Sequence, residues 1–253
     1  CYPTRSSFWG IAAPRNKPSA MVNKTERLVG LDALGLFAAG LINTFLALLD
    51  AGVVFGPGTE ARQAELLLRA AWIADHSLRW GGGWLFWFAV TLSFAGSYYA
   101  LGRHLGGSRP WRALAIGVAL IAAAVDLVGV LVNLTVLPEM AQALIAAPAG
   151  PDPALLLVFQ SLEKLAHALV NVTAFGLYSF AGLLLLPALF ATQSYPRRLA
   201  WLGAVEWSIA ALATILLVLA PDLATGPLLI SFALYAPWVW ASGVWLLRRE
   251  PTD

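Results

Sequence analysis

Residues 155–190 read LLLVFQSLEKLAHALVNVTAFGLYSFAGLLLLPALF. The stretch is long and apolar enough to cross a bilayer, which takes about 20 residues of helix. Its first half nevertheless carries polar side chains: Gln160, Glu163, Lys164, His167 and Asn171. An ionisable group in hydrocarbon costs about 2.5–3.5 kcal/mol on insertion scales, so such groups normally face a partner or a cavity. The sequence therefore predicts a bundle of further helices around this one.

The composition of the whole chain is that of an integral membrane protein. Of its 253 residues, 59% are hydrophobic and only 12% are charged, whereas a soluble domain carries about 25% charged residues. We therefore expect the lipid bilayer as the main partner, leave additional membrane subunits open, and expect no nucleic acid. Cys1 is the only cysteine, and there are three histidines. We expect no metal site, and the cofactor stays unknown.

Six apolar segments are long enough to span a membrane, which predicts an all-α, six-helix transmembrane bundle. The expected spans are 28–55, 74–101, 114–137, 155–190, 199–219 and 228–247. The predicted organisation is a polar segment over residues 1–27, a transmembrane domain over 28–249 and a short tail over 250–253. Because no ten-residue alternation is present, the pattern does not fit a membrane β-barrel.

Charge alternates between successive connections. The connections after the second and fourth spans carry Arg103, Arg109, Arg112, Arg197 and Arg198, and Arg248 and Arg249 follow the last span. The other connections are acidic or balanced. Positive residues favour the cytoplasmic side, so both termini are predicted to be cytoplasmic in a bacterial inner membrane.

The segment before the first span contains no apolar run typical of a secretory signal. Met21 looks like a natural start, so residues 1–20 are interpreted as an upstream extension. A lipoprotein that begins at Cys1 is the alternative, but it would place the N-terminus outside, against the charge pattern.

Two outer connections are predicted to form helices that lie along the membrane surface. Thr59 is a helix-start residue in 58–71, and Pro138 begins the segment 138–147, which a Pro-Ala-Gly-Pro run ends. The frequent tryptophans near the segment ends are interpreted as an aromatic belt.

The intramembrane polar residues are predicted to converge on one site that opens outward between the second, third and fourth spans. Counting about 1.5 Å per residue from the expected helix entry points places Asp126 and His167 near the midplane. By the same count, Asn133 and Glu163 lie together in the outer half. The proposed ligand- or proton-binding set is Asp126, His167, Asn171, Glu163, Lys164, Asn133, His76, Arg79 and Asp75.

Asp126 and His167 are predicted to form the central pair of this site. A lone ionised aspartate at the midplane is too costly to persist, and His167 is the nearest candidate at its depth. We expect a hydrogen bond between them, directly or through a water or Asn171. Such a pair would share a proton, as a proton relay requires.

Three interpretations of the polar residues stay open at this stage. The first is a ligand, proton or ion site. The second is a neutralised network that only fixes helix register, as in an accessory or scaffolding subunit of a larger complex. The third is a haem-binding redox subunit with His76 and His167 as axial ligands, although their estimated depths differ by roughly 10 Å. Glu206 stands apart without a basic partner, either as a protonated acid bonded to a neighbouring helix or as a relay member.

Two motifs resemble uncharacterised six-helix bacterial membrane proteins, which form a family of unknown function. One is Phe-x-x-x-Glu-Lys…Asn…Leu-Tyr-x-x-Ala-Gly-Leu-Leu-Leu over residues 159–186, and the other is the Arg-Trp…Trp…Trp run over 79–87. The resemblance implies the six-helix layout over residues 28–247 and supplies no catalytic residues.

The predicted orientation can be tested with single cysteines in a Cys1→Ser background. Because Ala149 follows the third span and Ser108 follows the second, a membrane-impermeant thiol reagent should label a cysteine at 149 from outside and one at 108 only after the membrane is opened. The reverse pattern would invert the topology.

Overall fold

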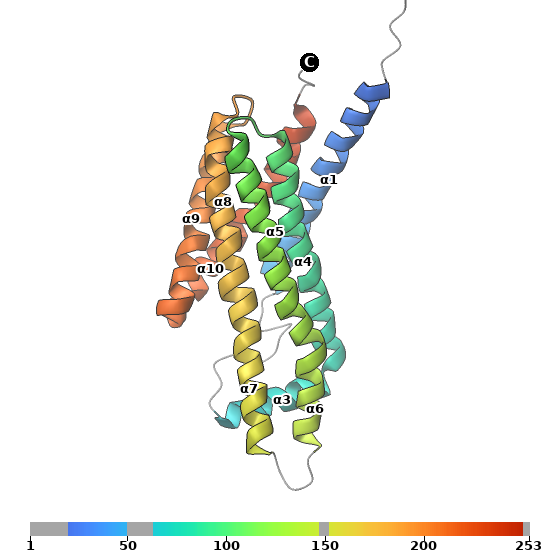
Figure 1. Cartoon of the computed structure of the whole chain (residues 1–253), viewed down its shortest axis with the longest axis vertical. Helices are drawn as coiled ribbons and strands as arrows, with labels where there is room; N and C mark the ends of the chain where they lie inside the picture. Colours follow the sequence, from blue (N-terminus) through green and yellow to red (C-terminus); the bar gives the residue numbers. More distant parts are fainter. Residues whose placement is uncertain (1–19, 50–62, 147–151, 250–253) are drawn as a thin grey trace, which may run out of the picture.

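The computed structural model describes residues 20–49, 63–146 and 152–249. These residues form an all-α bundle in which six helices are long and apolar enough to cross a membrane, as the hydropathy of the chain predicts (Figure 1). The protein is therefore a multi-pass membrane protein. Its main helices are α1 (Ala20–Leu49), α4 (Ser77–His104), α5 (Arg109–Leu131), α8 (Phe175–Ala191), α9 (Arg197–Leu219) and α10 (Thr225–Arg248).

Two of the spans continue well beyond the length that a bilayer needs. The helix α5 runs through a π-helical turn, η1 (Val132–Val136), into α6 (Leu137–Ile145). Likewise α7 (Pro153–His167) runs through the π-helical η2 (Ala168–Ala174) into α8. These two continuous helices have 37 and 39 residues, against about 20 for one crossing. The prediction of a separate surface helix over 138–147 is therefore wrong, because α6 extends the axis of α5 (Figure 1).

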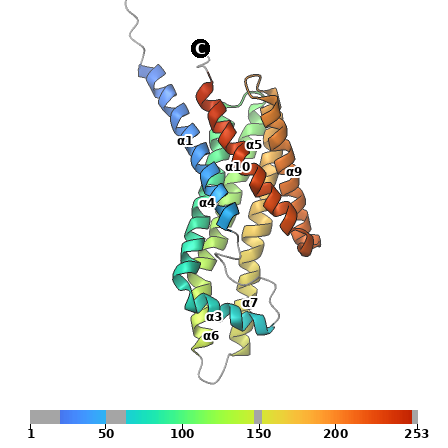
Figure 2. The same cartoon turned by 180° about the vertical axis from the view of Figure 1, so that it is seen from behind.

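A shorter helix, α3 (Gln63–Asp75), lies across the end of the bundle next to α6 and α7 (Figures 1 and 2). The expected surface helix over 58–71 agrees with it in part, since residues 50–62 lie outside the described structure. Together, α3, α6, α7 and the start of α4 enclose a second hydrophobic core, in which Leu66, Ile73, Trp80, Leu137 and Phe159 are buried. We call this part of the molecule the distal end.

The opposite end of the bundle, where α4, α8 and α10 end and α5 and α9 begin, carries the arginines of the connections, and we call it the basic end. There Asp32 of α1 accepts a hydrogen bond from His104 at 2.7 Å and lies 3.5 Å from Arg103. Arg249 donates to the carbonyl of His104. These contacts tie both α1 and the end of α10 to α4.

The helix α9 ends, and α10 begins, well short of the distal end (Figure 1). Gly176 of α8 faces Thr214 of α9, and the two helices run in opposite directions. The last residue of α9, Leu219, therefore lies level with about residue 171, inside η2. The six-helix layer ends at this level, and among the described elements only α4–α7 and α3 continue past it.

Close contacts between small residues and large rings hold the six-helix layer together. A Cβ atom on Gly182 would come within 2.1 Å of the Trp207 ring, and one on Gly203 within 2.6 Å of Trp238. Trp80, Trp207 and Trp238 are fully buried. The interpretation of Trp80 and Trp238 as part of an aromatic belt is therefore wrong, because these rings fill the interior of the bundle.

Candidate functional site

Asp126 is buried between α5 and α4, with 3% of its surface exposed. Thr91 donates a hydrogen bond of 2.7 Å to Asp126 Oδ2, and the indole of Trp87 donates one of 3.2 Å to Oδ1. Trp87 and Thr91 are four residues apart on α4, so they lie on the same helix face. Both carboxyl oxygens are thus satisfied by neutral donors.

The predicted pair between Asp126 and His167 is wrong. The imidazole of His167 is hydrogen-bonded to the amide of Asn171 at 2.9 Å, one turn along the same helix, while Asp126 turns toward α4. The prediction rested on the equal depth of Asp126 and His167. Two side chains at equal depth need not be in contact, because depth does not say which neighbouring helix each one faces.

The depth estimate assumed that the fourth span enters the membrane near Leu156, in α7, which extends beyond the six-helix layer. The end of α9 lies level with η2, so Glu163 and Lys164 lie beyond the six-helix layer and His167 at its edge. Gly129 of α5 contacts Val170. Asp126, one turn further in, therefore lies just inside this edge of the six-helix layer.

Glu163 belongs to a salt bridge of the distal end. Its Oε1 lies 2.7 Å from Nε of Arg69, whose side chain is almost completely buried. The guanidinium of Arg69 also lies over the ring of Trp80. Lys164 is exposed and does not take part in the salt bridge. Sequence reasoning missed Arg69 because it assigned this residue to a solvent-facing surface helix with balanced charge.

The polar residues at the start of α4 do not join the buried site. Asp75, His76 and Arg79 are exposed at the corner between α3 and α4. The His76 ring stacks on the Trp72 ring, and the Arg79 guanidinium lies over that same ring, 5.7 Å from its centroid. Their predicted place in an intramembrane pocket is therefore wrong.

Asn133 is buried where α5 becomes π-helical. Its side-chain amide donates to the carbonyl of Gly129, and its own carbonyl accepts a 2.6 Å hydrogen bond from the indole of Trp80. A π-helical turn leaves a carbonyl without its usual α-helical partner, and Trp80 fills that role here. Asn133 therefore links α4 to η1, and its side chain is satisfied locally.

Glu206 is the second buried acid of the six-helix layer, with 1% of its surface exposed. Ser231 of α10 donates a 3.0 Å hydrogen bond to Oε1. The other oxygen, Oε2, has no hydrogen-bond partner among the described residues. The predicted bond from Glu206 to a neighbouring helix is confirmed, whereas its protonation and its membership of a relay stay predictions.

Buried hydroxyl groups fill the space between the two acids. Tyr178 donates to the carbonyl of Thr91 at 3.3 Å, and Tyr98 donates to the carbonyl of Tyr178 at 2.5 Å. The rings of Tyr98 and Tyr235 both pack against Trp207, the neighbour of Glu206 in sequence. These tyrosines form a polar layer that begins beside Asp126 and ends beside Glu206.

The separation of the two acids along the bundle follows from the helix contacts. Gly129 contacts Val170, which places Asp126 level with about residue 173, while Trp207 contacts Gly182, which places Glu206 level with about residue 183. Ten residues of helix correspond to roughly 15 Å. Asp126 therefore lies at the distal edge of the six-helix layer, and Glu206 near its middle.

No group of three or more His, Cys, Asp or Glu side chains that could hold a metal ion occurs in the described parts of the chain. No family model, curated protein or solved structure matches this sequence. The resemblance to uncharacterised six-helix membrane proteins thus stays a prediction. The geometry of the two buried acids, Asp126 and Glu206, is therefore the basis for a proposed function.

The distal salt bridge gives a prediction about stability. Glu163→Ala removes the carboxylate beside the buried guanidinium of Arg69, so the free energy of unfolding in mixed micelles should fall by about 3 kcal/mol. Lys164→Ala is the matched control, and it should change that free energy by less than about 0.5 kcal/mol. Equal losses in the two variants would contradict the assignment of Arg69 as the partner.

Proposed function

We propose that this protein passes protons through the interior of its helix bundle, with Asp126 and Glu206 as the two sites that bind them. The observation that carries the proposal is that both carboxyl groups are buried in the six-helix layer with only neutral hydrogen-bond donors around them. A buried carboxylate without a cation is costly, so each acid is most stable when it carries a proton.

The contrast with Glu163 indicates that Asp126 and Glu206 do more than fix the register of the helices. Glu163 is matched with a buried arginine, as expected for a structural ion pair. Asp126 and Glu206 are not matched in this way within the described chain. An apolar side chain would serve packing better at both positions, which favours proton binding over a purely structural role.

The tyrosine layer supports a gated path between the two sites. In the described conformation, the hydroxyls of Tyr98 and Tyr178 donate to backbone carbonyls, and Tyr235 shares a 2.7 Å hydrogen bond with Ser97. A backbone carbonyl cannot accept a proton and transfer it to the next group. Protons therefore pass only when these hydroxyls reorient or water enters the layer, so the conformation described is the closed one.

Asp126 is proposed as the outer site. The arginine-rich end favours the cytoplasm of a bacterial inner membrane under the positive-inside rule, which places both termini in the cytoplasm and the distal end outside. Asp126 then lies nearest the outside, where η1 and η2 meet the end of α9. π-Helical turns inside α-helices frequently accompany functional sites, and η2 lies at the level of Asp126.

The haem interpretation receives no support from the geometry of the histidines. His76 is exposed and stacked on Trp72 at the corner of the distal end. The Nδ1 atom of His167 is engaged by Asn171. A path for protons needs neither side chain.

Proton flux in liposomes tests the proposal. Protein reconstituted with an interior pH dye should acidify or alkalise the lumen when a potassium diffusion potential is applied, faster than empty liposomes do. Asp126→Asn and Glu206→Gln each remove a protonation site at nearly constant shape, so each should reduce the protein-dependent rate at least tenfold.

Glu139→Gln is the matched control, because Glu139 is an exposed acid of α6 on the same extended helix as Asp126. It should leave the rate unchanged. All variants are compared at equal monodispersity and thermal stability in detergent. Wild-type flux equal to that of empty liposomes, or full flux in both buried-acid variants, would defeat the proposal, and a stoichiometric partner on native purification would then favour an accessory subunit.

A further inference from the structure

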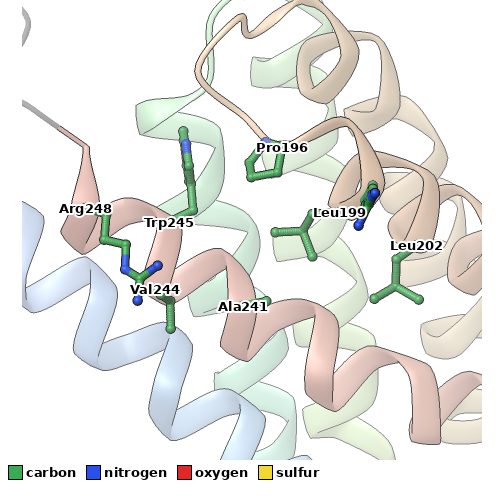
Figure 3. A pocket seen from close by; sticks show the side chains of 8 residues that line it. Pro196, Leu199, Leu202, Ala241, Val244, Trp245 and Arg248 are labelled. Carbon is green, nitrogen blue, oxygen red and sulfur yellow. The ribbon is translucent and has the colours of Figure 1, made fainter.

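A groove of about 400 Å³ opens on the side of the bundle at the basic end, between the start of α9 and the end of α10. Its walls are apolar: Leu199 and Leu202 of α9 face Ala241 and Val244 of α10 (Figure 3). Both α9 and α10 are long and apolar enough to cross a membrane, so lipid is the expected neighbour of the groove. A ligand that fits these walls must itself carry an apolar chain.

The floor of the groove is rigid. Trp245 donates a 2.8 Å hydrogen bond to the carbonyl of Ser194 and packs edge-on against Tyr195. Tyr195 in turn shares a 2.8 Å hydrogen bond with Ser242 of α10. These contacts fix the short connection between α8 and α9 against α10, so the groove exists before any ligand binds.

Two arginines that also line the groove give it a positive charge. Arg198 and Arg248 are exposed and make no hydrogen bond or ion pair with any other described residue. Their neighbours differ, since Arg197 donates to the carbonyl of Phe190 and Arg249 to that of His104. Of the four arginines here, only the two that line the groove are available for a ligand.

The start of α9 adds to the same positive field. The helix begins at Arg197 after Pro196, which lines the groove, and no side chain caps its first backbone N–H groups. Uncapped N–H groups at a helix start attract anions, and the helix dipole adds partial positive charge there. The anionic part of a ligand is therefore favoured beside Pro196 and Arg198.

We propose that this groove binds one anionic phospholipid, with its phosphate between Arg198 and Arg248 and an acyl chain along Leu199, Leu202 and Ala241. An apolar groove beneath two available guanidinium groups matches the two parts of such a lipid. Basic pockets between membrane helices bind anionic headgroups by the same combination of charge and shape. Arginine also suits phosphate, because its planar fork donates two parallel hydrogen bonds.

Native mass spectrometry of the purified full chain in detergent tests the site. Phosphatidylglycerol should remain bound at lower added concentration than phosphatidylcholine with the same acyl chains. The double substitution Arg198→Ala/Arg248→Ala should weaken phosphatidylglycerol binding roughly thirtyfold, from about fivefold for each basic residue at the membrane surface. Arg109→Ala, which removes an exposed arginine of the same end outside the groove, should leave binding unchanged.

Ala241→Phe tests the acyl part of the site separately, because it fills the groove and keeps both arginines. It should weaken phosphatidylglycerol binding as well. If the groove holds only a free anion, Ala241→Phe will have no effect and millimolar inorganic phosphate will displace the lipid, which overturns the proposal. Equal binding of the two lipids, or full phosphatidylglycerol binding by the double variant, also overturns it.

Discussion

The packing of the six-helix layer depends on two buried carboxyl groups. Neutral hydrogen-bond donors contact both of them, and no cation among the described residues pairs with either. Asp126 is held by Thr91 and Trp87, and Glu206 by Ser231. Each of these hydrogen bonds joins neighbouring helices, α5 to α4 and α9 to α10. Because an unsatisfied buried acid costs far more than a satisfied one, both helix pairs are held in the register that keeps the donors in place.

At the distal end, a carboxylate is instead paired with a buried cation. There a buried arginine of the crossing helix α3 meets Glu163 of α7, and aromatic rings of α3 and α4 pack around them. The ion pair lies past the end of α9 and the start of α10, where only part of the described bundle continues. The carboxylate of the distal end is therefore matched by a cation, whereas the two acids of the six-helix layer have only neutral hydrogen-bond donors among the described residues. This difference supports the proposal that Asp126 and Glu206 bind protons, whereas Glu163 has a structural role.

The sequence predicted the six-helix layout because hydropathy and the arginine pattern are local signals that do not depend on neighbours. It did not predict that 138–147 extends the third span, since a π-helical turn such as η1 leaves no clear mark in hydropathy. It also did not predict that the fourth helix begins outside the six-helix layer. His167 was therefore placed deeper in the bundle than the structure has it. Glu206 was interpreted correctly as an acid bonded to a neighbouring helix, because no cation lies near it in the chain.

The partner of each polar side chain was the least predictable feature. Asp126 was paired with His167 by depth, but the face of α5 that carries Asp126 turns toward α4, where Thr91 and Trp87 are suitable donors. Helix rotation depends on packing of residues such as Gly129 against Val170, which a single sequence does not reveal. Thr91 and the buried tyrosines were missed because single hydroxyl groups are common in membrane helices and carry no distinctive spacing.

The most direct test of this account is infrared spectroscopy of the protein in lipid at neutral pH. The account predicts an absorption of neutral carboxyl groups, distinct from that of carboxylates, which decreases in Asp126→Asn and in Glu206→Gln but stays the same in Glu139→Gln. If the neutral carboxyl absorption is missing from the wild type, or is unchanged in both buried-acid variants, the two acids are ionised and the central claim is contradicted.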